Sequence, residues 1–143
     1  MTTPIWFHQR PTLDLLNRPM PTMVTHLSIV ITAIGDDFLT ATMPVDHRTH
    51  QPFGILHGGA SVALAESLGS MGAYLCVDPN LYNVVGLEIN ANHIRAVRTG
   101  HVVGIARPLH IGKSTQIWEI RITDEADKLV CISRITLAVL AKS

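Results

Sequence analysis

One carboxylate stands in a long apolar stretch of this chain. Between residues 60 and 77, the only acidic or basic side chain is that of Glu66. The stretch is long enough for about five helical turns and is apolar on nearly every side, which predicts a buried central helix. An unpaired buried charge costs several kcal/mol, so Glu66 is either a structural acid paired with a distant Arg or Lys, or a functional carboxylate.

Two glycines precede this stretch, where the predicted helix must begin. The first backbone N–H groups of a helix have no partner within it, and the helix dipole adds partial positive charge at the same end. Because Gly58 and Gly59 have no side chain to shield these groups, a ligand carbonyl can approach them closely. This arrangement suits the negative charge that develops on an acyl oxygen during acyl transfer.

The spacing of these groups predicts a site that two subunits share. Gly58 and Glu66 are eight residues apart, which is about 12 Å along a helix axis. A reacting carbonyl must lie within ~3 Å of both its oxyanion donor and the attacking group. One helix can hardly serve both, so we expect Gly58 of one subunit to face Glu66 of a second in a symmetric dimer.

The remaining elements fit a sheet wrapped around that helix. Six runs predict strands, and short turns between the last four favour antiparallel pairing; the runs are residues 24–33, 38–45, 84–97, 101–109, 115–123 and 129–140. In the fifth run, alternation places three residues on one face: Trp118, Ile120 and Ile122. We expect an α+β fold in a single domain over residues 1–143, with residues 1–23 as an N-terminal arm in which Thr12 caps a short helix.

The charge balance excludes several classes of partner. Lys and Arg number 11 and Asp and Glu number 11, so no net charge points to nucleic acid or to an anionic membrane. The first ten residues lack the cationic start and apolar run of a signal peptide, and the serines and Glu66 make residues 60–77 a poor membrane span. We therefore predict a cytoplasmic protein in which Cys76 and Cys131 are reduced core residues.

The segment that leads into the helix resembles a known family. Its sequence is QPFGILHGGAS over residues 51–61, followed by Ala65 and Glu66, and it is similar to that of the hotdog-fold acyl-CoA thioesterases. It looks most like the subclass related to 4-hydroxybenzoyl-CoA thioesterase and 1,4-dihydroxy-2-naphthoyl-CoA hydrolase. The resemblance implies a hotdog fold, hydrolysis of an aromatic acyl-CoA or an acyl-carrier-protein thioester, and dimers that pair into tetramers.

By this resemblance, the motif supplies the catalytic groups. Glu66 is the catalytic carboxylate, either as a nucleophile through a mixed anhydride or as a general base on water. The N–H of Gly58 binds the thioester oxygen with Gln51 as a second donor, and His57 orients this loop or the thioester. Ser70 lies one turn beyond Glu66 on the same helix face, and it matches a position that holds water or substrate.

Substrate contacts are expected from three further places. Met71 and Tyr74 on the helix are candidates for the acyl pocket. His93 and Arg95 share one face of a strand that, by the resemblance, lines the acyl and pantetheine channel; ordinary surface or interface packing is the alternative. The turn of residues 109–114 resembles one that meets the CoA nucleotide, and its candidate contacts are His110, Gly112 and Lys113.

Other chemistries fit the sequence less well. His47, His50 and His57 have no carboxylate or thiolate at ligand spacing, so we predict no metal site. Thioester hydrolysis needs no cofactor, since coenzyme A is part of the substrate. Ser61 lies outside any nucleophile-elbow pattern. The alternatives on the same fold are a non-catalytic protein that binds acyl-CoA or an acyl carrier, and a hydratase or dehydratase.

Overall fold

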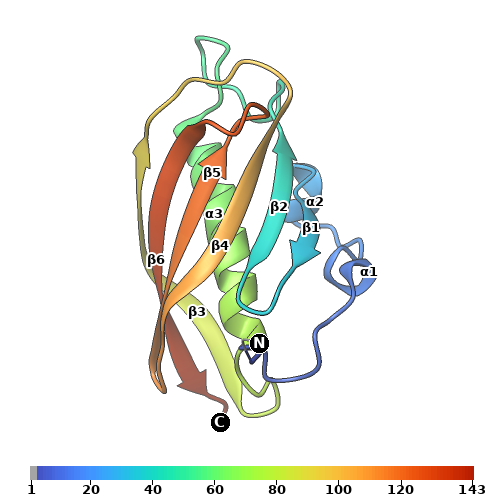
Figure 1. The fold of residues 1–143 in the computed structure, drawn as a ribbon, viewed down its shortest axis with the longest axis vertical. Coiled ribbons are helices and arrows are strands. Elements are labelled where there is room, and N and C mark those ends of the chain that lie inside the picture. The colour runs from blue at the N-terminus through green and yellow to red at the C-terminus, as the bar shows by residue number, and fades with distance from the viewer. Residues whose placement is uncertain (1–2) are drawn as a thin grey trace.

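A long helix lies in the curve of a six-stranded antiparallel sheet (Figure 1). The computed structural model describes residues 3–143. The strand order is β1-β2-β4-β5-β6-β3, and each neighbouring pair is antiparallel. This is the predicted α+β arrangement. Its elements are α1 (Leu13–Leu16), α2 (Met23–His26), β1 (Val30–Ile34), β2 (Leu39–Pro44), α3 (Gly58–Leu75), β3 (Tyr82–His93), β4 (His101–Ile111), β5 (Thr115–Thr123) and β6 (Leu129–Ala141).

The segment before the first strand differs from the prediction. The sequence predicts a strand over residues 24–33, but α2 occupies the first part of this range and β1 begins only at Val30. The N–H of His26 donates to the carbonyl of Thr22, which closes a helical turn, and Ser28 at φ 54° follows it. Local backbone bonding here overrides the strand preference of β-branched residues. We therefore define the arm as residues 3–29.

The start of the arm is attached to the rest of the chain through Trp6, and a side-chain cap stabilises α1 within the arm. Trp6 is buried, donates from Nε1 to the carbonyl of Gly35 at 2.8 Å, and stacks on Trp118 with 6.4 Å between the ring centroids. Thr12 caps α1 as predicted, because its Oγ1 accepts the N–H of Leu15 at 3.2 Å. None of the helices within residues 3–143 has the length and hydrophobicity that a membrane span requires.

Small residues let α3 approach the sheet closely. A Cβ atom added at Gly72 would lie 2.7 Å from the ring of Trp118, and one added at Gly69 would lie 2.6 Å from Ile135. Larger residues at these positions would push the helix away from the sheet.

The predicted alternation of β5 is confirmed, because its inward side chains are fully buried: Trp118, Ile120 and Ile122.

Only one side of α3 is buried, which corrects the prediction of a helix enclosed on nearly every side. The helix starts and ends two residues earlier than the apolar stretch, and the sheet covers the face with Ser61, Leu64, Ala65, Leu68, Gly69, Gly72 and Ala73. We call the opposite, half-buried or exposed face the open stripe: Gly59, Val62, Ala63, Glu66, Ser67, Ser70, Met71 and Tyr74. One curved sheet cannot surround a helix, so this stripe lacks full cover within the described chain.

The two edges of the sheet are protected differently. At the β1 edge, the side-chain amide of Asn17 bonds the N–H and the carbonyl of Ile31 at 2.7 and 2.8 Å, and so mimics a neighbouring strand. At the other edge, β3 pairs with β6 on one side only, and Val85 and Leu87 are exposed. An open edge with exposed apolar side chains is a template for pairing with another chain.

Candidate active site

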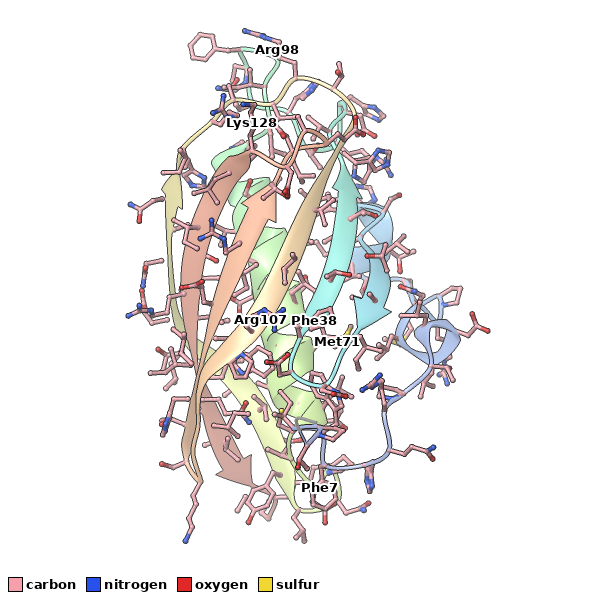
Figure 2. All side chains as sticks on the ribbon, viewed as in Figure 1. Phe7, Phe38, Met71, Arg98, Arg107 and Lys128 are labelled. Atoms are coloured by element: carbon pink, nitrogen blue, oxygen red, sulfur yellow. The ribbon has the colours of Figure 1, made fainter. Side chains whose placement is uncertain are left out.

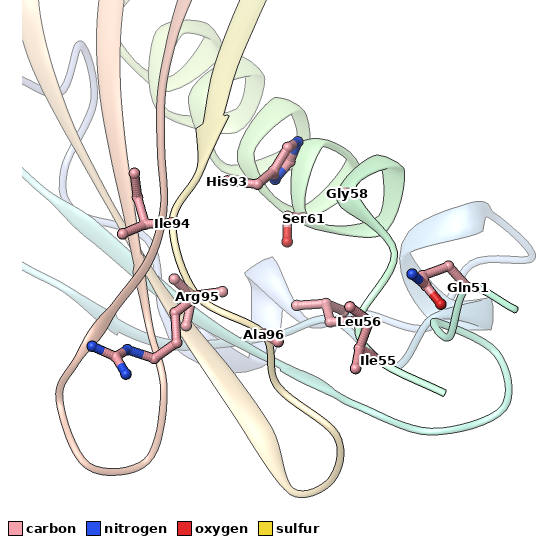
Figure 3. Close-up of a pocket in the computed structure, with 10 residues that line it drawn as sticks. Gln51, Ile55, Leu56, Gly58, Ser61, His93, Ile94, Arg95 and Ala96 are labelled. Carbon is pink, nitrogen blue, oxygen red and sulfur yellow. The ribbon is translucent and has the colours of Figure 1, made fainter. Parts of the chain in front are cut away.

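A cavity of about 330 Å³ opens at the amino-terminal end of α3 (Figure 3). Its lining comes from the loop before α3, from the first turn of α3, and from the end of β3 with the segment after it. It includes Gln51, Leu56, Gly58, Ser61, His93 and Arg95. The cavity therefore brings together four of the predicted site residues, which are far apart in the sequence.

The N–H of Gly58 has no acceptor among the described residues. His57 is the N-cap of α3, and its Nδ1 accepts the N–H of Gly59 at 2.7 Å. The carbonyl of His57 accepts the N–H groups of Ala60 and Ser61 at 3.0 and 3.2 Å. The Gly58 N–H, beside the cavity, is thus left as a free donor at the positive end of the helix dipole.

His57 has a capping role and does not line the cavity. Its backbone is extended, at φ −68° and ψ 131°, as is usual for an N-cap residue. Because Nδ1 accepts a hydrogen bond, the neutral ring carries its proton on Nε2. The cap fits the predicted role of orienting this loop, whereas direct contact with a thioester stays a prediction.

The loop before α3 also fixes the side chain of Gln51. The N–H of Gln51 donates to the carbonyl of Ile55 at 2.9 Å, and Gly54, at φ 75°, donates back to the carbonyl of Gln51 at 3.0 Å. The side-chain Oε1 of Gln51 accepts the N–H of Phe53. Its NH₂ group remains available as a donor, and Figure 3 shows that nitrogen on the side of the helix terminus.

His93 packs directly on the start of α3. A Cβ atom added at Gly58 would lie 2.7 Å from Nε2 of His93, so a larger residue would displace the ring. β3 ends at His93, before the end of the predicted strand 84–97, because the N–H groups of Ile94 and Arg95 both turn to the carbonyl of Val130. Arg95 borders the cavity, but its guanidinium points away from the helix (Figure 3).

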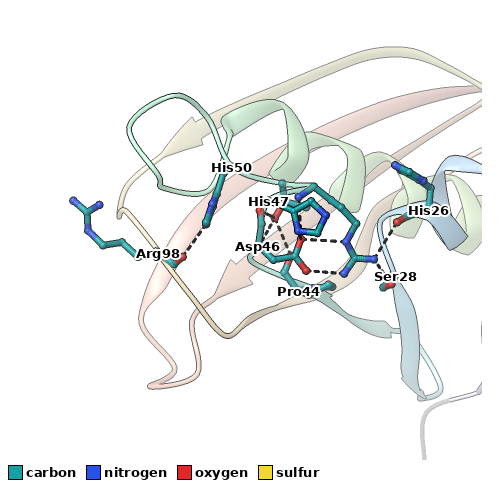
Figure 4. Close-up of polar contacts among 9 residues, drawn as sticks. His26, Ser28, Pro44, Asp46, His47, His50 and Arg98 are labelled. Atoms are coloured by element: carbon teal, nitrogen blue, oxygen red, sulfur yellow. Dashed lines mark hydrogen bonds and ion pairs between the residues drawn. The ribbon is translucent and has the colours of Figure 1, made fainter.

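Arg48, which was not predicted as a site residue, anchors the loop to the arm; Figure 4 labels its partners Asp46, His26 and Ser28. Arg48 binds the carboxylate of Asp46 through Nε at 3.1 Å and Nη2 at 2.6 Å. Its Nη1 donates to the carbonyl of His26 at 3.2 Å and to Oγ of Ser28 at 2.7 Å. Hydrogen bonds from Arg48 hold the pKa of Asp46 far below its ordinary value. The only signal in the sequence is the two-residue spacing of the opposite charges.

Further hydrogen bonds fix the other side of this loop. The hydroxyl of buried Thr49 donates to the carbonyl of Pro44 at 3.0 Å, and its own carbonyl accepts the N–H of His57 at 2.8 Å. Nε2 of His50 lies 2.8 Å from the carbonyl of Arg98 (Figure 4). The loop is held on both sides, and with it the direction of the first amide of α3.

Glu66 lies outside this cavity, further along α3. It is half-buried on the open stripe, and a Cβ atom added at Gly86 would lie 2.5 Å from its Oε1. β3 has a bulge between Gly86 and Glu88, and bulges often lie next to active sites. Within residues 3–143, the Glu66 carboxylate has no hydrogen bond or ion pair. A structural pairing with Arg or Lys therefore finds no support in the described chain.

The other predicted helix residues share the open stripe with Glu66. Ser70 follows Glu66 by four residues and Tyr74 follows Ser70 by four, so the three side chains face the same way. Met71 lies on the flank of the stripe toward the arm, where it borders a second cavity (Figure 2). None of these residues lines the cavity at the start of α3.

The predicted CoA-nucleotide turn lies at the far end of the sheet. His93 stands in register with three residues of β6, β5 and β4: Cys131, Ile122 and Gly104. The end of β4 and the turn after it lie roughly 20–30 Å further along β4, and they carry the predicted contacts His110, Gly112 and Lys113. Within one chain, this turn and the cavity are therefore well separated.

The described residues include potential metal ligands and two cysteine thiols. No group of three or more potential metal ligands forms within residues 3–143. Burial raises the pKa of the Cys76 thiol to about 12 and also raises the pKa of Cys131. Both thiols are free and protonated at neutral pH, which fits a packing role.

Known proteins with similar sequences and structures identify the family of this chain. Residues 53–131 match the thioesterase superfamily. The chain is 55% identical to the 1,4-dihydroxy-2-naphthoyl-CoA hydrolase of Escherichia coli K12, over 95% of this chain and 99% of that protein. It is 56% identical to the proofreading thioesterase EntH of Cronobacter sakazakii, over 95% and 98%. A crystal structure of a mutant thioesterase from Pseudomonas aeruginosa, 50% identical, matches with a TM-score of 0.94 over 96% of this chain and 99% of that one. The chain therefore belongs to the thioesterase superfamily, a family of thioester hydrolases whose hotdog fold it shares.

Proposed function

We propose that this protein hydrolyses an acyl-CoA thioester to the free acid and coenzyme A, at a site built from two copies of the chain. The observation that carries the proposal is the free N–H of Gly58, held at the positive end of α3 beside a cavity. Such a donor stabilises the negative charge on the thioester oxygen in the transition state. Glu66 supplies the carboxylate that the reaction needs.

Two routes lead from these groups to the products. In the first, an oxygen of Glu66 attacks the thioester carbon, the C–S bond breaks, and water then hydrolyses the mixed anhydride. In the second, Glu66 takes a proton from water, the water oxygen adds to the carbon, and the thiolate leaves. In both routes, the N–H of Gly58 and the amide of Gln51 hold the oxyanion. The thiolate leaves readily, so a strong general acid is not required.

A second copy of the chain is needed because Gly58 and Glu66 lie about 12 Å apart along one helix. The open β3 edge and the open stripe form the surface for it, whereas Asn17 closes the β1 edge. We infer that the β3 strands of two copies pair around a two-fold axis, so that Glu66 of one copy lies near Gly58 of the other. The assembly of such dimers into tetramers stays a prediction.

The names of the relatives support an aromatic substrate. One is named as a hydrolase of 1,4-dihydroxy-2-naphthoyl-CoA and another as a proofreading thioesterase. We propose an aromatic acyl group carried on coenzyme A, with an acyl-carrier-protein thioester as the alternative. The proposed reaction uses no cofactor, and a cytoplasmic location remains our expectation from the sequence.

The alternatives on this fold have less support. A protein that only binds acyl-CoA does not need a carboxylate opposite an oxyanion donor. A hydratase or dehydratase acts on the carbon atoms beyond the carbonyl, and the relatives named above are a hydrolase and thioesterases. Both alternatives predict that thioesters persist in the presence of the protein.

Thiol release from a panel of acyl-CoAs tests the proposal. The panel contains benzoyl, hydroxybenzoyl, dihydroxynaphthoyl and straight-chain acyl-CoAs, assayed with wild type, Glu66→Gln and Glu119→Gln. We expect Glu66→Gln to lower kcat by ~10²–10⁴-fold, as loss of a catalytic base or nucleophile does. Glu119 lies on β5, between the inward-facing Trp118 and Ile120, and its variant is the matched control. A folded Glu66→Gln protein with wild-type turnover of every substrate would disprove the role of Glu66.

A further inference from the structure

A second cavity, of about 250 Å³, lies between the arm and α3, where Met71 is labelled in Figure 2. Its apolar lining comes from the arm, from β1 and from one residue of α3: Leu16, Val24, Ile29, Ile31 and Met71. The cavity opens to the surface, where part of its lining is exposed, and a concave site with a largely apolar lining is a candidate ligand site. We call it the arm cavity.

Two polar side chains of this lining are already bonded within the chain. The side chain of Asn17 donates from Nδ2 to the carbonyl of Ile31 and accepts the N–H of Ile31 at Oδ1. Oγ of Ser28 accepts a hydrogen bond from Arg48 at 2.7 Å. Polar groups without partners would hold ordered water in such a space. The other polar lining residues, Arg18 and Thr25, are exposed to solvent at the rim. The buried part of the arm cavity, lined by apolar side chains, therefore fits an apolar occupant better than water.

The open stripe connects the arm cavity with Glu66. On an α-helix, Met71 is turned by about 140° from Glu66 and lies roughly 7.5 Å further along the axis. The helix surface between them carries Ser67 and Ser70, whose side chains are small. The hydroxyl of Ser67 donates to the carbonyl of Ala63 at 2.7 Å and so needs no further partner. An acyl group that starts beside Glu66 can therefore cross the helix over these serines and reach Met71.

We propose that the arm cavity binds the far end of the acyl group and that Leu16 limits the size of this group. The inference rests on the proposed function and adds an acyl subsite to it. Leu16 lines the cavity from α1 and also packs against the core, so its size sets the space that remains. The arm, which lies outside the sheet, then becomes the part of the chain that selects aromatic or short aliphatic acyl groups over longer ones.

A pair of neighbouring leucines provides the test. Leu16→Ala widens the arm cavity, whereas Leu15→Ala removes the same atoms from a side chain that is 61% exposed and does not line it. The readout is kcat/KM for benzoyl-CoA, naphthoyl-CoA and straight-chain acyl-CoAs of increasing length. For Leu16→Ala, we expect kcat/KM for larger groups to rise relative to smaller ones by roughly fourfold for each further methylene that the cavity accepts. Leu15→Ala should leave these ratios unchanged.

A second variant, Leu16→Phe, completes the test, and a melting curve shows whether each variant is folded. Leu16→Phe keeps an apolar side chain on α1 and should shift the ratios the opposite way, which covers the case in which Leu16→Ala does not fold. Unchanged ratios in Leu16→Phe and in any folded Leu16→Ala, with hydrolysis still dependent on Glu66, would overturn the acyl subsite. An equal shift in Leu15→Ala would also overturn it, because it would mean general loosening of the arm. Hydrolysis that no longer depends on Glu66 would instead reject the proposed function.

Discussion

The two regions of α3 that carry the predicted chemistry differ in how completely one chain builds them. At the first turn, an ion pair and many hydrogen bonds fix the loop of residues 46–57, and the N–H of Gly58 has a defined direction beside a cavity. In the middle of the helix, Glu66 lies on the open stripe without a hydrogen-bond partner among the described residues. The contrast indicates two half-sites: the donor half is complete in one chain, and we infer that a second copy completes the carboxylate half.

Within the donor half, the largest effect is expected from removing one hydrogen atom. Gly58→Pro deletes this N–H, and the backbone tolerates it, because proline is favoured at the first helical position and His57 before it is extended. We expect kcat to fall by ~10²–10³-fold, as it does when an oxyanion donor is lost. The measurement is thiol release by the purified variant, beside its melting temperature.

Gly58→Ala is the matched control for this change. It adds a Cβ atom at the same place, 2.7 Å from Nε2 of His93, but it keeps the N–H. Its kcat should therefore stay well above that of Gly58→Pro. Equal losses in the two variants would show that crowding at His93, and not the missing donor, lowers the rate.

Mixing two inactive variants tests whether the half-sites come from different chains. In a heterodimer of Glu66→Gln and Gly58→Pro subunits, a shared arrangement leaves one site with both changes and the other site with neither. Random reassortment of the subunits should then restore about a quarter of the wild-type activity. The assay is performed on co-refolded protein. Activity no higher than that of the separate variants would mean that one chain builds the whole site.

A smaller effect is expected when the loop of the donor half is loosened. Arg48→Ala removes the bonds to Asp46, His26 and Ser28, and we expect kcat to fall by about tenfold with little change in KM, because misplacement of a catalytic group affects mainly the transition state. Arg48→Lys should restore part of this loss. Arg107→Ala removes the same charge from an exposed pair with Asp37 and is the control (Figure 2).

The pH dependence of the Arg48 effect follows from Asp46. Its pKa is lower in the folded state than the ordinary value of 3.8, so its stabilising contribution is complete above that pH and is lost only as the pH falls through the folded pKa. The activity ratio of Arg48→Ala to wild type should thus be constant between roughly pH 6 and pH 8. A ratio that changes in this range, or an equal loss in Arg107→Ala, would contradict the anchoring role.

The smallest effect concerns the cap of α3. His57→Ala removes the acceptor of the Gly59 N–H, and we expect the free energy of unfolding to fall by about 1 kcal/mol, measured by thermal or urea denaturation. His57→Asn keeps a short acceptor at the N-cap and should restore the stability. An Asn variant as unstable as the Ala variant would argue against the capping role. If stability returns while kcat stays low, His57 also contacts the thioester.

Strong local signals made much of the fold predictable. The apolar run around Glu66 predicted α3 to within two residues at each end, and the alternation in β5 placed both its boundaries and its buried face. Only the last part of the strand predicted over residues 24–33 formed, because the helical turn of α2 competes with the strand preference of the residues before it. The arm cavity and the Arg48 anchor were not predictable, since each depends on contacts between distant segments.

The sequence alone determined that a carboxylate would sit eight residues along the helix from a glycine amide, because helical rise depends only on residue number. Together with the motif before the helix, this separation pointed to a thioesterase with shared sites. Only the tertiary structure decided which amide lacks a partner, which face of α3 stays open and which edge of the sheet is closed by Asn17. These features depend on long-range hydrogen bonds and on packing between segments, which residue spacing does not contain.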